Sequence, residues 1–177
     1  MLNDGKERLY AHKVMLVTYS EYFYRYFDFE SQQDNKSRHS NGSPPTIITI
    51  CDFTANVYRA YLHFIYTGSI NENFGIQPQP LISNNNDNDN NNSNNNQLTI
   101  ETKIIFLVQL TELAMLYEED DLLQVCLNYL ISPDSKLLQI NTALFMYNQA
   151  YQCRTVPVIE KCLEFITKNC SEMLNKL

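Results

Sequence analysis

Cysteine and histidine are among the side chains of this sequence that could ligate a metal or act as a nucleophile. The five cysteines contain no C-x-x-C pair and no histidine at a ligand spacing, so their pattern does not predict a metal site. Because the given sequence begins with polar and charged residues, we expect no secretory signal and reduced thiols packed as small apolar side chains. These are Cys51, Cys126, Cys153, Cys162 and Cys170.

The histidines and carboxylates form no recognisable catalytic motif. His39 belongs to a polar segment and His63 to a segment with aromatic neighbours. There is no Gly-x-Ser-x-Gly, His-Glu-x-x-His or glycine-rich phosphate loop, which are the patterns that place a nucleophile, a zinc ion or a phosphate. The acidic residues cluster where helices are expected to begin, a position that the helix dipole favours. We therefore expect no enzymatic activity, no metal and no cofactor.

Charge and hydropathy narrow the class of partner. The 177 residues carry a formal net charge of -7 and are 44% hydrophobic and 12% aromatic. The acidic excess argues against binding to nucleic acid. No apolar run approaches the ~20 residues that cross a bilayer, so we expect no membrane association. Together with the expected absence of a secretory signal, these features predict a globular protein that is cytoplasmic, or also nuclear.

Two polar stretches interrupt the apolar pattern. Residues Ser31 to Pro45 are rich in Gln, Asn and Ser, and residues Asn84 to Asn96 comprise ten Asn, two Asp and one Ser. Neither has enough apolar surface to offset the entropy of ordering, so both are predicted to be loops. The Asn tract is most simply a tolerated loop insertion. An aggregation-prone or condensing tract is the alternative interpretation.

The first half of the chain predicts two helices and one strand. Apolar residues recur every three or four positions over Val14 to Phe29, which predicts one amphipathic helix. The β-branched run Thr46 to Ile50 predicts a short strand. Thr54 suits the start of the next helix, and Gly68 suits the left-handed residue that ends it.

The second half predicts four further helices. An apolar helix over Glu101 to Tyr117 is followed by an acidic run, in which Asp120 or Asp121 can cap a helix that ends before Pro133. Asn141 is predicted to cap the next helix, and Pro157 suits the first turn of the last one. The fold class is therefore α+β and mostly helical.

The first helical segment contains a spaced motif, H-x-x-x-L-x-x-x-S-x-x-F-x-x-x-F. Its residues are His12, Leu16, Ser20, Phe23 and Phe27. This motif resembles that of the BTB (POZ) domain family. The family's next landmark, a short strand that ends in an acidic residue before a helix that ends in Y-T-G, is matched by Ile47 to Asp52 and Phe53 to Gly68.

Later segments continue the resemblance. Leu110 to Tyr117 and Leu122 to Leu130 are similar to the next two family helices, and Val57 to Leu62 resembles the BTB region of proteins that join chromosome-condensation-regulator-type repeats to a BTB domain. Residues 1–131 are thus predicted to be a BTB/POZ-like domain, and residues 132–177 resemble the start of the BACK helical extension.

The resemblance implies a protein-interaction module, specifically a substrate adaptor for a cullin-3-type ubiquitin ligase. Assembly without a ligase role, or a truncated BTB fragment, remains the alternative. The chain lacks the strand and helix that build the usual family dimer, so we expect BTB self-association to be weakened. The family's hydrophobic-x-Glu motif is also altered, because Phe29 and Glu30 are adjacent.

The resemblance further implies a contact surface on the loop after Phe27 and on the helices around Tyr117 to Leu130. The residues predicted to form it are Phe29, Glu30, Tyr117, Glu118, Glu119 and Asp120. The same resemblance predicts that His12 anchors the first helix or is a satisfied buried histidine. It also predicts that Phe23, Phe27, Tyr61 and Tyr66 belong to the core.

Overall fold

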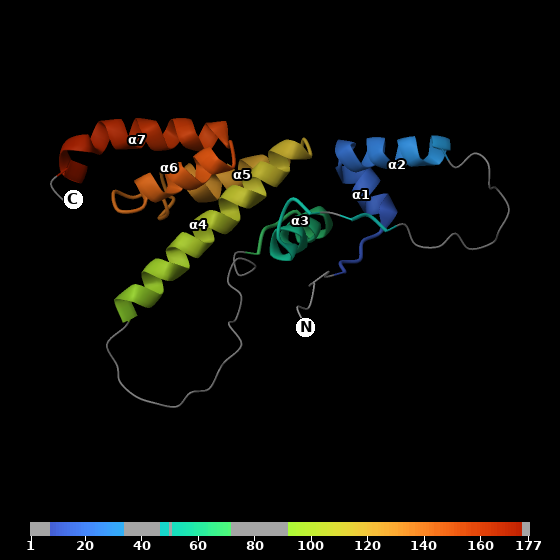
Figure 1. Ribbon diagram of the computed structural model, residues 1–177, viewed down its shortest axis with the longest axis horizontal. Helices are drawn as coiled ribbons and strands as arrows, with labels where there is room; N and C mark the ends of the chain where they lie inside the picture. Colours follow the sequence, from blue (N-terminus) through green and yellow to red (C-terminus); the bar gives the residue numbers. More distant parts are fainter. Residues whose placement is uncertain (1–7, 34–46, 50, 72–91, 175–177) are drawn as a thin grey trace, which may run out of the picture.

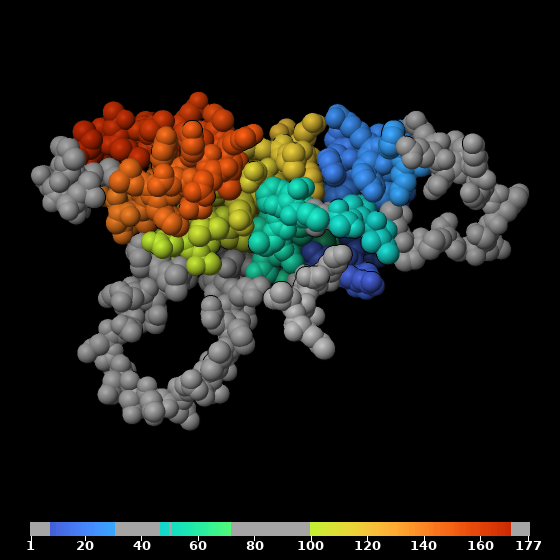
Figure 2. All heavy atoms as spheres, in the orientation of Figure 1, coloured from blue at the N-terminus to red at the C-terminus, as the bar shows by residue number. Residues whose placement is uncertain are grey.

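A computed structural model describes residues 8–33, 47–49, 51–71 and 92–174, and these residues form seven helices and no strand. Helices α1 and α2 lie at one end of the molecule and α6 and α7 at the other, with α3, α4 and α5 between them (Figure 1). The space-filling view in Figure 2 shows the same order, from the blue N-terminal helices to the red C-terminal ones. The helical part of the predicted fold class is confirmed.

The predicted helix over residues 14–29 is in fact two helices, α1 (Lys13–Tyr19) and α2 (Glu21–Gln33). Ser20 separates them in an extended conformation, with φ -126° and ψ 116°. Its hydroxyl accepts a hydrogen bond from the Phe23 amide at 3.5 Å, which is how serine begins a helix. The chain therefore changes direction at Ser20 while the apolar spacing continues on both sides.

Helix α3 (Ala55–Thr67) agrees with its prediction at both ends. Thr54 precedes it in an extended conformation, although its side chain makes no capping hydrogen bond. Gly68 follows it in the left-handed region, with φ 69°, and its amide donates to the Phe64 carbonyl at 2.7 Å. Glycine adopts this conformation without the steric cost that a Cβ would add.

Helices α4 (Asn92–Leu116) and α5 (Asp120–Ile131) form a hairpin. Helix α4 begins inside the Asn tract, so the loop prediction is wrong for residues 92–96, while 84–91 lie outside the described residues. Extending an existing helix adds a backbone hydrogen bond for each residue fixed, which even asparagine tolerates. At α5 the N-cap position belongs to Glu119 rather than to Asp120 or Asp121, which occupy the first turn.

A second hairpin consists of α6 (Ala143–Gln152) and α7 (Val156–Leu174). The N-cap position of α6 is Thr142 and not Asn141. The Thr142 hydroxyl hydrogen-bonds to the Leu137 carbonyl and accepts from the Gln139 amide at 3.0 Å, which orders the turn before the helix. Pro157 lies in the first turn of α7, as predicted.

The predicted strand at residues 46–50 is not formed in the part of the chain that the structure describes. Residues 47–49 have no regular structure, and residues 46 and 50 lie outside the described ranges. A strand requires a neighbour to receive its backbone hydrogen bonds, and the described residues contain no strand that could pair with this segment. Of the polar stretch 31–45, residues 31–33 belong to the end of α2, and the remainder is not described.

One apolar core runs through all seven helices. Its largest fully buried side chains include Tyr61 of α3, Leu110 of α4 and Met146 of α6. Helix α4 supplies most of the centre because it packs against α3, α5 and α6. No helix of the described residues is long and apolar enough to span a bilayer.

Candidate functional site

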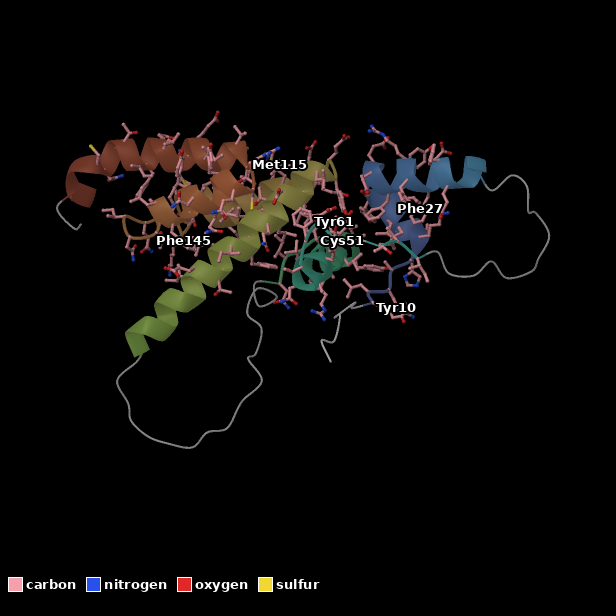
Figure 3. All side chains as sticks on the ribbon, viewed as in Figure 1. Tyr10, Phe27, Cys51, Tyr61, Met115 and Phe145 are labelled. Carbon is pink, nitrogen blue, oxygen red and sulfur yellow. The ribbon has the colours of Figure 1, made fainter. Side chains whose placement is uncertain are left out.

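A buried polar group joins α2, α3 and the turn between α4 and α5. The Tyr61 hydroxyl donates a hydrogen bond to Oε1 of Glu119 at 2.8 Å, and the Ser20 hydroxyl hydrogen-bonds to both residues. All three residues are buried, with Glu119 only 8% exposed. Figure 3 labels Tyr61 near the middle of the molecule, between the elements that this group connects.

Burial sets the ionisation of this group. Desolvation raises the pKa of the Glu119 carboxyl, and the hydrogen bonds from Ser20 and Tyr61 offset part of that rise. Burial likewise raises the pKa of Tyr61, with the nearby Glu119 charge adding to the effect. Burying such a carboxyl costs free energy, but here it accepts hydrogen bonds from the hydroxyl groups of Tyr61 and Ser20. Its evident role is to hold three elements in register.

Beside this group, a second hydroxyl pair joins α3 to the end of α4. Tyr58 and Tyr117 place their hydroxyl oxygens 2.7 Å apart in the interior. Burial raises the pKa of Tyr58 to about 12. The ring of Tyr117 also stacks on Tyr22 of α2, with ring centroids 4.3 Å apart. Tyr117 therefore has one face against the core and one against α2.

The solvent side of this junction is a surface that we call the turn surface. It consists of exposed residues of α2 and of the α4–α5 turn, namely Tyr22, Arg25, Phe29, Leu116, Glu118 and Asp120. The Arg25 guanidinium lies 3.7 Å from Oε2 of Glu118, which bridges the two elements. Phe29 is 64% exposed, so its predicted exposure is confirmed.

The structure separates the six residues predicted for the partner surface. Phe29, Glu118 and Asp120 are exposed, and Glu30 is half-buried. Tyr117 is 2% exposed and Glu119 8% exposed, so neither side chain is available to a partner. The correction has a physical cause, because Tyr58, Tyr61 and Ser20 supply internal hydrogen bonds to these two residues. Their sequence neighbours Leu116 and Glu118 face solvent instead.

The surface also contains residues that the sequence pattern did not identify. Tyr22 and Arg25 belong to the segment predicted as an amphipathic helix, and the pattern did not distinguish them from its other residues. A signal was available, because Tyr22, Arg25 and Phe29 are spaced by three and four residues and so share one side of a helix. The buried side of the same helix carries Phe23 and Phe27.

The remaining motif residues have structural roles. His12 is exposed and precedes α1, where its Nδ1 atom lies 2.7 Å from the Tyr66 hydroxyl and its amide donates to that oxygen at 2.8 Å. This confirms His12 as an anchor of the first helix and excludes the buried alternative. Phe23, Phe27 and Tyr61 are core residues as predicted, whereas Tyr66 is 42% exposed.

The potential metal ligands and thiols of the described residues do not gather into a further candidate site. The described part of the chain contains no group of three or more His, Cys, Asp or Glu residues able to hold a metal ion. The five cysteines are free, with Cys126 and Cys162 buried, Cys153 half-buried, and Cys51 and Cys170 exposed. Burial raises the pKa of Cys126 to about 12 and that of Cys162 to about 11, so these two thiols stay protonated and behave as small apolar side chains.

Comparison with known proteins supports the class of module. The family model of the BTB/POZ domain matches residues 1–86, which include α1, α2 and α3. No curated protein and no solved structure matches the chain. BTB/POZ domains generally mediate protein–protein interactions and self-association, and the match supports a role of this kind for the matched residues.

Proposed function

We propose that this chain is a substrate adaptor that binds a cullin-3-type ubiquitin-ligase scaffold through the turn surface. The observation that carries the proposal is the exposed Phe29 of α2. On the same side of this helix, Arg25 forms an ion pair with Glu118 of the α4–α5 turn. An exposed aromatic side chain flanked by charged residues has the composition of an interface anchor with a polar rim.

The turn surface is held rigid by contacts beneath it. Tyr22 stacks on the buried Tyr117. The buried Glu119, two positions further along the turn, accepts a hydrogen bond from Tyr61 of α3. Arg25 contacts both Glu21 at 3.0 Å and Glu118 at 3.7 Å. A preorganised surface loses little conformational entropy when a partner binds. This rigidity supports an interface role for the surface.

The proposal extends to the rest of the chain. Hairpin α6–α7 is the start of a BACK-like extension, and the adaptor works in the cytoplasm or nucleus by binding, without catalysis. Support for the extension comes from its direct packing on the α4–α5 hairpin, which makes one continuous body of the two regions.

Calorimetric titration with a purified cullin-3 N-terminal domain tests the adaptor role. The unmodified chain should bind with a Kd in the micromolar range or tighter, and Phe29→Ala should weaken binding roughly thirty-fold. Tyr24→Ala is the matched control, since Tyr24 is a 53% exposed aromatic residue of the same helix that points about 140° away from Phe29. No binding at tens of micromolar would remove the ligase role.

Assembly without a ligase role is the second candidate, and a separate set of exposed residues favours it. Tyr10, Val14 and Ile47 are large apolar side chains in the N-terminal part and are 64% to 85% exposed. Exposed apolar side chains of this kind promote association. Sedimentation velocity across a concentration series should show weak, reversible self-association that Val14→Glu reduces. A dimer that does not dissociate on dilution would contradict the weakened association that we propose.

A further inference from the structure

The turns of the two helical hairpins have the same uncommon backbone. Glu118 and Arg154, 36 positions apart, are the non-glycine residues of the described chain with positive φ, at 57° and 53°. In each turn the next residue donates its amide five positions back, from Glu119 to Ala114 at 2.8 Å and from Thr155 to Ala150 at 3.0 Å. Left-handed residues followed by this hydrogen bond end a helix in a defined direction. The two hairpins thus turn in the same way.

The buried residues repeat with the same spacing of 36 positions. Five interior residues of α4–α5 have interior counterparts in α6–α7, and every member of these five pairs is at most 1% exposed. The pairs are Leu107 with Ala143, Leu110 with Met146, Ala114 with Ala150, Leu122 with Val158, and Cys126 with Cys162. The second hairpin is therefore a structural copy of the first, as in proteins built from stacked helical repeats.

The second hairpin stacks on the first. We call the side of each hairpin that carries Tyr117 or its counterpart Cys153 the front, and the opposite side the back. Tyr117, on the front of the first hairpin, packs on Tyr58 and Tyr61 of α3. Its counterpart Cys153 instead meets Glu112 of α4, which hydrogen-bonds to its thiol. Since α6 lies against α4 and α7 against α5, the second hairpin covers the back of the first in the way that the first covers α3.

The back of the second hairpin is left uncovered within the described residues. Val108 of the first hairpin is 0% exposed, whereas its counterpart Leu144 is 45% exposed. Thr111 is fully buried, whereas its counterpart Tyr147 is only half-buried and stacks on Tyr151, which is 66% exposed. We call this surface the outer face. It consists of Leu144, Tyr147 and Tyr151 of α6 and of Ile159, Leu163 and Ile166 of α7.

The outer face is apolar along both helices. Leu144, Tyr147 and Tyr151 follow one another at spacings of three and four on α6, a helix with no charged residue. On α7 the stripe consists of the exposed Leu163 and of half-buried Ile159 and Ile166, which lie four positions before it and three after it on the same side. Glu160, three positions before Leu163, borders this stripe. Glu164 directly follows Leu163 and is turned about 100° away from it.

We propose that the outer face binds an amphipathic helical hairpin of a partner protein, packed as α6–α7 packs on α4–α5. Two parallel apolar stripes fit a pair of helices better than a single one. The α6 stripe has no charged residue and selects an apolar contact face, while Glu160 lies at the edge of the α7 stripe. A second copy of this chain is a poor occupant, because the matching front of its α4–α5 hairpin is already covered by α3. This surface is separate from the turn surface.

The proposal can be tested with an extended chain in which a third hairpin is added after the second. Residues 137–174 are repeated after residue 177 through a flexible Gly-Ser linker of about fifteen residues, long enough to span two helix ends. The added hairpin should pack on the outer face, protect its own amides from hydrogen exchange, and raise the melting temperature by about 5 °C. Amides of the added hairpin that exchange as in an unfolded chain would overturn the proposal.

Substitutions then locate the contact. Leu144→Glu with Tyr151→Glu should abolish both effects in the extended chain, and Leu163→Glu alone should reduce them. The same changes should leave the original chain's melting temperature unaltered, because these side chains are exposed there. Tyr24→Glu, which alters an exposed aromatic residue of α2, is the control.

Two outcomes would overturn the proposal. If the added hairpin stays protected in the double variant, it packs somewhere other than on the outer face. If the unmodified chain forms a dimer that Leu144→Glu dissociates, the outer face serves self-association instead.

Discussion

Tyr61 and Glu119 form a hydrogen bond of 2.8 Å in the interior, between the middle of α3 and the first residue before α5. Both residues are buried, and burial raises the pKa of the carboxyl. A carboxyl of this kind binds a proton more tightly in the folded chain than in the unfolded one. Protonation of Glu119 therefore favours folding, and its charge at neutral pH opposes folding.

The first prediction follows from this sign. The stabilising contribution of Glu119 is complete below its unfolded pKa and is lost as the pH rises through the raised folded pKa. Glu119→Gln keeps an acceptor for Tyr61 without the charge, so it should raise the free energy of unfolding at pH 7 relative to the unmodified chain. Urea unfolding at pH 4.5 to 8 measures this, and the advantage of the variant should shrink toward the acid end.

Glu119→Leu is the control for the loss of charge alone. It removes the charge but also leaves the Tyr61 and Ser20 hydroxyl groups without their acceptor, which costs about 1–3 kcal/mol for a buried polar group. If Glu119→Leu proved as stable as Glu119→Gln, the hydrogen bond would have no structural role.

The second prediction concerns the hydroxyl pair of Tyr58 and Tyr117, which are 2.7 Å apart. Tyr117→Phe should cost about 1–3 kcal/mol, because it leaves the buried Tyr58 hydroxyl without a partner. The double variant Tyr58→Phe with Tyr117→Phe should recover part of that loss, since both polar groups are then removed. Denaturant unfolding of the four chains in a double-mutant cycle gives the coupling energy. A coupling of zero would contradict the pair.

The third prediction concerns the anchor of α1. Tyr66→Phe removes the oxygen that contacts both the amide and the ring of His12. Because the contact is solvent-exposed, the expected cost is only about 0.5–1.5 kcal/mol, and it should appear as faster amide exchange in α1 before any change in α4 or α5. His12→Ala should have a similar but smaller effect, because the backbone amide remains. Uniform loss of protection in all helices would instead assign Tyr66 to the global core.

Sequence periodicity located most of the helices, but not the break in the first one, the start of α4 or the polar contacts among the helices. The helix after Thr54 and its end at Gly68 follow from local rules, as does Pro157 in the first turn of α7. The break at Ser20 does not, because it depends on buried partners from α3 and the α4–α5 turn. For the same reason Glu119 appeared to be one more surface carboxylate in an acidic run, although the fold gives it two hydroxyl partners.

The partner surface was predictable in part. Phe29 follows the buried Phe27 by two positions, and that spacing alone turns its side chain toward solvent. Tyr117 could not be separated from its exposed neighbours Leu116 and Glu118, because the helix ends there and the left-handed Glu118 changes the direction of the chain. The relation between the two hairpins needed the structure, since only five interior pairs and the turn geometry repeat.

The fourth prediction addresses the Asn-rich segment. Replacing residues 84–91 with a Gly-Ser linker of equal length should change the free energy of unfolding by less than about 1 kcal/mol, because loop closure depends weakly on composition. Residues 92–96 are left unchanged, since they are the start of α4. Thermal and urea unfolding of the two chains make the comparison. A large loss of folded protein would show that the segment contributes specific contacts.

The last prediction separates interface from core on a single helix. Phe27 and Phe29 both belong to α2, but Phe27 is 5% exposed and Phe29 is 64% exposed. Phe27→Ala should therefore destabilise the chain by about 3–5 kcal/mol through the cavity it leaves, and with it any binding activity. Phe29→Ala should leave the melting temperature within about 1–2 °C of the unmodified chain, since surface substitutions have small effects, while it lowers the affinity for the scaffold domain. Calorimetric melting paired with titration of the same samples distinguishes the two cases. Equal losses of stability in both variants would assign Phe29 to the core and leave the turn surface without its aromatic anchor.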